Sequence, residues 1–371
     1  MPTAILAGAF GQRNPGDEAL LDAFTGALPE WDVIATAAVP PHGHATEVVS
    51  SDDPARVARA VARADAVVFA GGTVFKELSA RTRRPPLDLL HKGAALAYGA
   101  KALGKRLAMV GVGAAPIRPS HGQRLARGLI RQADLLVLRD EESADVLAEL
   151  GAPTPFRIGA DAAWTLVEHQ PEAREPSDRV IVALSSEAGG DELVDELAAA
   201  LVPLLAQGLA VSLQPWQIGG PMRPDDLDMA RALAARLGGT ADILLPPADL
   251  DDAIDVFADA RLVVGLRFHA LIAAAAAGRP FVAYAHEPKL LGAARRLAQP
   301  AVSPADGGDA LAAVLLSAAN RPVAPTPAAV RGEIARAAES MRLLRLVLSD
   351  GEGAEPESIG TLPLKPAEWS V

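Results

Sequence analysis

Short apolar runs rich in β-branched residues alternate with Ala- and Leu-rich runs along most of the chain, and this alternation constrains the fold more than any other feature. Strands are expected at 3–8, 32–36, 65–70, 105–111 and 134–138, and again at 179–184, 208–213, 261–265 and 280–284, with helical segments between them. Strands that are apolar throughout and are separated by helices form parallel sheets buried on both faces. The pattern therefore predicts an α/β protein with two doubly wound domains that face each other across a cleft.

Two breaks divide the chain. Its 371 residues exceed one ordinary core and suit two domains of about 150–190 residues each. A polar, proline-bearing segment at 167–178 is the best linker candidate, so we expect an N-terminal domain over 1–170 and a C-terminal domain over 178–320. After a second proline-rich break, a Leu-, Ala- and Arg-rich helix over 326–348 is expected to pack back on the domains. A surface-bound or mobile tail would follow at 350–371.

The composition excludes several classes of site and partner. The chain has no cysteine, which excludes disulfides, cysteine-ligated metals, iron–sulfur clusters and a cysteine nucleophile. A net charge of −11 argues against a nucleic-acid partner and allows at most peripheral membrane association. The N-terminus has no basic leader and no apolar run is long enough to span a membrane, so we expect a cytoplasmic protein. The motifs call for no metal and no cofactor.

In doubly wound sheets, ligands bind beyond the carboxyl ends of the strands, so polar residues placed there are the candidates for function. After the first strand, Asn14 and Asp17 fall in a loop and in the first turn of a helix. They could bind substrate hydroxyls, with Asp17 as a base, or the segment could be only a loop before an acidic helix start. After the third strand, Gly71 and Gly72 would let backbone N–H groups approach a ligand, although paired glycines also serve any tight turn.

Two further polar residues end strands in the first half. Arg139 closes the fifth strand and is either an ion-pair partner or an anion clamp. Asp161 ends the first domain, and a structural role in a turn or an ion pair is favoured for it. The segment 111–116 begins like a dinucleotide-binding fingerprint but carries Pro116 where the third glycine belongs, so it is weak evidence for NAD.

The polar residues of the second half gather at two successive strand ends. The run 263–278 indicates a buried strand, a tight turn and an apolar helix, with Arg267 on the turn and His269 at the helix mouth. A helix N-terminus favours an anion, and these two side chains add to that preference. Lys289 follows the next strand, and adjacent parallel strands lie about 4.8 Å apart. The three groups are therefore expected to converge on a phosphate or a carboxylate.

Taken in order over residues 5–290, these clusters resemble the polysaccharide pyruvyl transferase family. The segments that carry the resemblance are 14–18, 71–72, 111–113, 139–143, 161–163, 267–270 and 288–289. The resemblance implies a GT-B-like pair of Rossmann-like domains, phosphoenolpyruvate as donor, and a sugar of a cell-surface polysaccharide or its lipid-linked precursor as acceptor. A pyruvate ketal would be the product. It also implies that the donor's phosphate and carboxylate are held by Arg139, Arg267, His269 and Lys289.

The chemistry of this donor suits the residues. Phosphoenolpyruvate carries up to three negative charges in a small volume, and arginine forks match both of its anionic groups. Ketal formation also needs a proton on the enol methylene and removal of a proton from the attacking sugar hydroxyl. His269 suits the acid role because histidines exchange protons near neutral pH. Asp17 is our choice for the base on the acceptor side.

Three positions differ from the family's pattern: Ala70 where relatives often carry glycine, Ser185 where many carry arginine, and His286 where tyrosine is usual before the Pro-Lys pair. Two alternatives stay open. A GT-B glycosyltransferase with a nucleotide-sugar donor would use the same cleft and should offer a ribose-binding carboxylate, for which Glu287 is the candidate. A non-catalytic sugar- or anion-binding relative would fit the departures at Ser185 and His286. The sequence does not determine the acceptor, and it leaves a homo-oligomer open.

Overall fold

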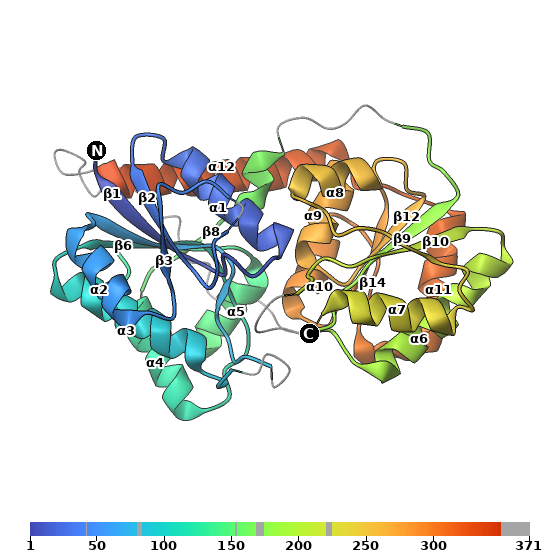
Figure 1. Cartoon of the computed structure of the whole chain (residues 1–371), viewed down its shortest axis with the longest axis horizontal. Coiled ribbons are helices and arrows are strands. Elements are labelled where there is room, and N and C mark those ends of the chain that lie inside the picture. Colours follow the sequence, from blue (N-terminus) through green and yellow to red (C-terminus); the bar gives the residue numbers. More distant parts are fainter. Residues whose placement is uncertain (42, 80–83, 153, 168–173, 220–224, 350–371) are drawn as a thin grey trace, which may run out of the picture.

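The protein is described by a computed structural model at residues 1–41, 43–79, 84–152, 154–167, 174–219 and 225–349. The expected tail at 350–371 and the middle of the expected linker, 168–173, lie outside these described residues. The described chain forms two parallel β-sheets side by side, each with its own helices (Figure 1). The prediction of an α/β protein with two doubly wound domains is confirmed.

The first sheet has the strand order β3–β2–β1–β4–β6–β7–β8, with β5 beside β6, and every pair is parallel. The order reverses at β1, which has β2 on one side and β4 on the other. The strands are β1 (Thr3–Ala7), β2 (Asp32–Ala37), β3 (Glu47–Ser50), β4 (Ala66–Ala70), β5 (Thr73–Phe75), β6 (Arg106–Ala114), β7 (Leu135–Leu138) and β8 (Arg157–Ile158). The helices are α1 (Pro15–Ala27), α2 (Pro54–Arg63), α3 (Asp88–Ala102), α4 (Ser120–Ile130), α5 (Glu141–Glu149) and the 3₁₀ helix η2 (Ala162–Leu166).

The second sheet repeats the scheme with the order β11–β10–β9–β12–β13–β14, again all parallel, and it reverses at β9. Its strands are β9 (Arg179–Ala183), β10 (Ala210–Gln214), β11 (Asp242–Ile243), β12 (Leu262–Gly265), β13 (Phe281–Tyr284) and β14 (Ala301–Val302). Its helices are α6 (Asp191–Ala206), α7 (Asp226–Arg236), α8 (Leu250–Phe257), α9 (Phe268–Ala276), α10 (Pro288–Arg296), η3 (Pro304–Asp306) and α11 (Gly307–Asn320).

Each strand contributes side chains to two hydrophobic cores, because successive side chains point to opposite faces of a sheet. In the first sheet, Leu6 and Val68 join the core that extends toward the second domain, whereas Ile5 and Val67 join the core on the other face. All four side chains are fully buried. This two-sided burial explains why the strands are apolar at every position instead of alternating.

Helix α9 places the candidate site at the domain junction. Its residues Ala270–Ala276 are all buried, and small side chains on every side let it lie close to β12, β13, α8, α10 and also η2 of the first domain. The last helix, α12 (Pro327–Ser349), returns from the second domain to the first, where it packs on η2 and β6 (Figure 1). Arg106 on β6 donates from Nη1 to the carbonyl of Val347 near the end of α12, at 3.1 Å. Of the helices in the described ranges, none is both long and apolar enough to cross a bilayer.

Candidate functional site

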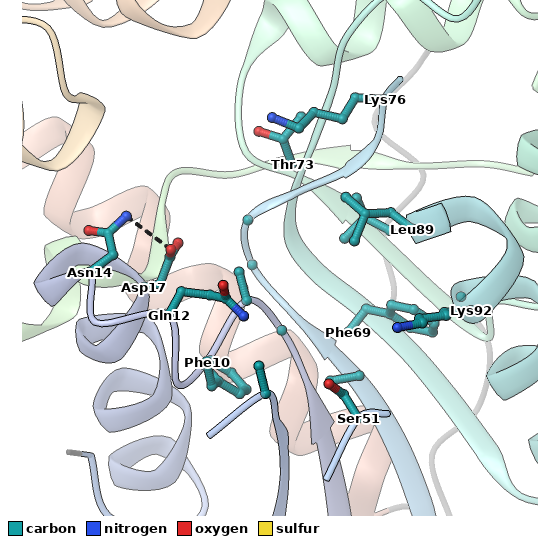
Figure 2. A pocket seen from close by; sticks show the side chains of 18 of the residues that line it. Phe10, Gln12, Asn14, Asp17, Ser51, Phe69, Thr73, Lys76, Leu89 and Lys92 are labelled. Carbon is teal, nitrogen blue, oxygen red and sulfur yellow. Dashed lines mark hydrogen bonds between the residues drawn. The ribbon is translucent and has the colours of Figure 1, made fainter. Parts of the chain in front are cut away.

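A pocket of about 250 Å³ lies at the carboxyl ends of the strands, where loops of the two domains meet. Loops after β1, β4 and β7 form one wall, and loops after β12 and β13 form part of the other. Figure 2 shows side chains that line the pocket, with Asn14 and Asp17 at the left of the view, Thr73 and Lys76 at the top, and Leu89 and Lys92 at the right. Eight of the residues that the sequence nominated line it: Asn14, Asp17, Gly71, Gly72, Arg139, Arg267, His269 and Lys289. Glu287, the candidate carboxylate for ribose, is not among its lining residues.

The loop after β1 is held by the residues that start α1. The side-chain oxygen of Asn14 accepts from the backbone N–H of Gly16 at 3.1 Å and caps the helix. Its amide nitrogen donates to Asp17 Oδ2 at 3.0 Å (Figure 2). Both polar ends of Asn14 are therefore engaged in shaping this loop, and Asp17 presents its carboxylate to the pocket from the first turn of α1.

The loop after β4 depends on its glycines. Gly71 and Gly72 have φ of 68° and 72°, which is the left-handed region that favours glycine. The N–H of Gly71 donates to the carbonyl of Val110 at 2.9 Å, and the carbonyl of Gly72 accepts from Gly113 at 2.7 Å. The N–H of Gly71 is thus engaged by the backbone, and the pair shapes the wall from which Thr73 and Lys76 reach the pocket.

Arg139, directly after β7, is buried and surrounded by anchoring groups. Its Nε donates to Asp140 at 2.9 Å, its Nη1 lies 3.6 Å from Asp161, and its guanidinium carbon stacks 4.6 Å from the ring centre of Phe268. Burial alone would lower the pKa of Arg139, but the Asp140 and Asp161 carboxylates raise it above its ordinary value. Gly113 makes room for this side chain, because a Cβ there would stand 2.6 Å from Arg139 Nη2. The result is a fixed positive charge on the first-domain wall.

Arg267 is held just as firmly on the opposite wall. Its Nη2 donates to both oxygens of Asp226, at 2.9 and 2.7 Å, and its Nε donates to the carbonyl of Leu184 at 3.3 Å. Asp226 is fully buried and also accepts from the N–H and hydroxyl of Ser186. Burial would lower the pKa of Arg267, yet the Asp226 carboxylate raises it. Arg267 thus has a structural role in addition to the pocket that it lines.

His269 stands in the first turn of α9 and faces the first domain. Its Nε2 lies 3.5 Å from Asp161 Oδ1. The Nδ1 side of the ring lies against the start of α1, where a Cβ on Gly16 would come within 2.1 Å of Nδ1. Glycine at this position is therefore required for the histidine to fit. Both neighbouring groups come from the first domain, so the imidazole of the second domain lies between α1 and the residue that precedes η2.

Two lysines converge on one carboxylate at the domain boundary. Lys289 Nζ lies 2.5 Å from Glu287 Oε2, and Lys76 Nζ reaches Glu287 Oε1 across the boundary at 3.4 Å. Burial would raise the pKa of Glu287, but the two lysines hold it well below its ordinary value. Burial lowers the pKa of Lys289, and the charges of Lys76 and Arg139 act in the same direction. This end of the pocket therefore has more cationic than anionic groups facing one small volume.

Sequence reasoning missed Lys76 and Asp226. Lys76 lies soon after the Gly71–Gly72 turn, and a cation at such a position after a strand could have been nominated from the sequence. Asp226 lies among several acidic residues at a helix start, where such residues are common, so the sequence held no signal for its pairing with Arg267. Within the described ranges, no group of three or more His, Asp or Glu side chains is arranged to hold a metal ion.

The model of one protein family, polysaccharide pyruvyl transferase, matches residues 14–288, which is most of the chain. The chain belongs to the polysaccharide pyruvyl transferase family. The expectation drawn from the ordered strand-end motifs is thereby confirmed. A search of curated proteins with this sequence gave no match.

Solved structures share the fold of this pyruvyl transferase family member at low sequence identity. The UDP-GlcNAc 2-epimerase of Methanocaldococcus jannaschii is 12% identical with a TM-score of 0.61, over 94% of this chain and 100% of that one. Anabaena Alr3699/HepE, solved in complex with UDP and glucose, is 15% identical with a TM-score of 0.61 over the same shares. A glycosyltransferase from Rickettsia africae is 12% identical with a TM-score of 0.54, over 94% of this chain and 96% of that one. The fold is thus the GT-B arrangement of two Rossmann-like domains.

Proposed function

We propose that this protein transfers a pyruvyl group from phosphoenolpyruvate to a sugar of a cell-surface polysaccharide or its lipid-linked precursor, and forms a pyruvate ketal. The observation that carries the proposal is that both domains contribute cations to one small pocket. Four of its six Lys and Arg side chains, two from each domain, carry the argument: Arg139, Lys76, Arg267 and Lys289. A compact donor with a phosphate and a carboxylate would meet all four, and a buried site strengthens each charge-assisted contact. Membership of the family supports the same donor.

The pocket also supplies the groups that the reaction needs. In the first step a sugar hydroxyl oxygen bonds to C2 of the donor, its proton passes to Asp17, and His269 gives a proton to the methylene carbon C3. In the second step the bond from C2 to the phosphate oxygen breaks and phosphate leaves. A second hydroxyl of the same sugar then bonds to C2 and passes its proton to the released phosphate. The proton held by Asp17 returns to His269 through water, so that both side chains regain their starting states. Overall, one hydroxyl proton ends on C3, which becomes a methyl group, and the other ends on the released phosphate. The reaction therefore requires no oxidant or reductant.

The departures from the family pattern are compatible with this chemistry. Ser185 is buried, and its carbonyl accepts from the N–H of Ala188 at 3.0 Å, so it supports the loop after β9. Burial lowers the pKa of His286, which favours a neutral imidazole whose Nδ1 lies 3.3 Å from the carbonyl of Tyr284. Neither residue adds a negative charge to the pocket, so the cationic character that the donor requires is preserved.

One observation bears on the nucleotide-sugar alternative. Relatives of the fold have been solved with UDP, and a ribose-binding carboxylate would be needed for such a donor here. Glu287 was the candidate, but both of its oxygens face lysines. Binding ribose hydroxyls would require this carboxylate to leave two cations, which favours the smaller anionic donor.

Titration calorimetry with phosphoenolpyruvate tests the proposal, and phosphate release in the presence of simple hexosides tests turnover. Loss of Lys289 or Lys76 in alanine variants should weaken phosphoenolpyruvate binding by about tenfold or more, because each removes a contact worth roughly 1.5–3 kcal/mol. Lys101→Ala is the matched control, since this lysine pairs with Asp134 on the outer surface. Absence of phosphoenolpyruvate binding by the wild-type protein, or tight binding of UDP-sugars that depends on Lys289, would overturn the proposal.

A further inference from the structure

Asp161 is a buried carboxylate that the proposed reaction does not yet use. Its side chain has no exposure, and the N–H of Ala163 donates to Oδ1 at 3.0 Å. His269 Nε2 approaches the same Oδ1 at 3.5 Å, and Arg139 Nη1 approaches Oδ2 at 3.6 Å. Asp161 Oδ2 and His269 Nε2 are both buried without a hydrogen bond within the described part of the chain. A buried polar atom without a hydrogen bond costs free energy. The nearest partner for Asp161 Oδ2 is Arg139 Nη1, and the nearest partner for His269 Nε2 is Asp161 Oδ1.

The pair spans the two domains. Asp161 follows β8 and begins η2 of the first domain, whereas His269 belongs to α9 of the second. Helices α9 and η2 are in contact, so a small closing movement would bring the 3.5 Å separation into hydrogen-bond range. The carboxylate that can orient the histidine therefore comes from the opposite domain.

The two sides of the ring have different neighbours. With Nε2 toward Asp161, the Nδ1 side lies against Gly16 at the start of α1, in the space that any side chain there would fill. A histidine that donates Nε2–H to a carboxylate keeps Nδ1 for proton exchange, because the partner of one ring nitrogen determines the state of the other. Asp17 lies one residue after Gly16 and lines the same pocket, so Nδ1 is the nitrogen on the side of the proposed base.

We propose that Asp161 is a positioning residue, which fixes the His269 ring through Nε2 and completes the acid only when the two domains are closed on each other. The inference rests on the proposed function. Asp161 is the charged group in direct contact with the imidazole. The other charged residues that line the pocket with His269 are Asp17, Lys76, Arg84, Lys92, Arg139, Glu187, Arg267 and Lys289.

The ionisation of Asp161 agrees with this role. Burial would raise the pKa of Asp161, but His269 and the Arg139 guanidinium hold it below the ordinary value. The carboxylate is therefore charged at neutral pH, as a partner for an imidazolium must be. Asp161 thus presents a negative charge to the imidazole from the first domain.

The test compares Asp161→Asn with the wild-type enzyme by steady-state kinetics from pH 5.5 to pH 9, a range that brackets the ordinary titration of histidine at about 6.5. We expect kcat of Asp161→Asn to fall by about 100-fold or more. The affinity for phosphoenolpyruvate should change by less than about threefold, because Arg139, Lys76, Arg267 and Lys289 all stay. The alkaline limb of the plot of kcat against pH should move to lower pH. The double variant Asp161→Asn/His269→Gln should lose little beyond His269→Gln alone, since the two act as one unit.

Two further measurements keep the inference falsifiable. Hydrogen–deuterium exchange at the imidazole C2 of His269 reports its protonation without any turnover, and its midpoint should fall in Asp161→Asn. If that variant fails to fold, Gly16→Ala displaces the ring from the other side and should reduce kcat in the same manner. An unchanged kcat and an unchanged exchange midpoint would overturn the role of Asp161. Absence of phosphoenolpyruvate binding by the wild-type protein would instead overturn the proposed function.

Discussion

Removal of the Asp226 carboxylate should destabilise the second domain more than any other single change near the pocket. Asp226 accepts two contacts from Arg267, two from Ser186, and one each from the N–H groups of Trp216 and Gln217, at 3.2 and 2.9 Å. In Asp226→Ala the guanidinium stays buried without its partner, which costs about 3–5 kcal/mol. The orphaned N–H groups add to this, and water entering the cavity offsets part of it. We expect a loss of about 4–6 kcal/mol, which is a large share of a typical ~5–15 kcal/mol.

Graded variants separate the contributions. Asp226→Asn keeps the volume and one accepting oxygen but removes the charge, so we expect an intermediate loss of about 2–3 kcal/mol. Ser186→Ala removes only the hydroxyl bond, which spans 2.7 Å, at a cost of about 1 kcal/mol. Asp228→Ala is the control, because this exposed residue pairs with Arg231 on the surface and should leave stability unchanged.

Urea unfolding followed by tryptophan fluorescence provides the assay. Trp216 is fully buried in the second domain and its backbone N–H donates to Asp226, so among the four tryptophans of the chain it is the one whose signal reports on this contact. The order of destabilisation should be Asp226→Ala, then Asp226→Asn, then Ser186→Ala. A loss below about 1 kcal/mol in Asp226→Ala would refute the reasoning, because it would mean that the buried pair with Arg267 contributes no more than an exposed one.

Two more predictions concern Arg139 and Glu287. Gly113→Ala should weaken phosphoenolpyruvate binding by about tenfold, because the new Cβ would stand 2.6 Å from Arg139 Nη2 and displace a charge-assisted contact. Gly99→Ala, at a position with open space, is its calorimetric control, and equal affinities in the two variants would contradict the prediction. Glu287 has a lowered pKa, so its contribution to stability is present above the ordinary titration range of glutamate, about 4.3, and is lost as the pH falls below it. The melting temperature of wild type should therefore drop more between pH 7 and about pH 3.5 than that of Glu287→Gln, and parallel drops in scanning calorimetry would count against the Glu287–Lys289 pair.

The main strands and helices could be predicted because their pattern is local. β1, β4, β7, β9, β12 and β13 lie within a residue or two of the expected positions, since each is a continuous apolar run between helical segments. The short strands β3, β5, β8, β11 and β14 were not predicted. They are two to four residues long, and Asp242–Ile243 of β11 is exposed. A strand of this length carries too few residues for a pattern, and only pairing with a neighbour defines it.

The candidate site divides in the same way. The sequence placed Arg139, Arg267 and Lys289 at strand ends, where ligands bind in such sheets, and all three line one pocket. The position of a residue at a strand end does not show whether its charge is already paired with another side chain. Arg267 is paired with Asp226, 41 residues away, and Lys289 shares Glu287 with a lysine from the other domain.

By itself the sequence determined the two-domain parallel architecture, the family and several of the polar residues that line the pocket. The hydrophobic pattern is sufficient for the architecture, and the order of the polar motifs along the chain indicates the family and the site. Only the tertiary structure decided the partner of each charge: Asp226 for Arg267, Lys76 beside Glu287, and Asp161 against His269. The physical reason is that ionisation and hydrogen bonding depend on distances of a few ångströms between residues far apart in sequence, and packing of the two domains sets those distances.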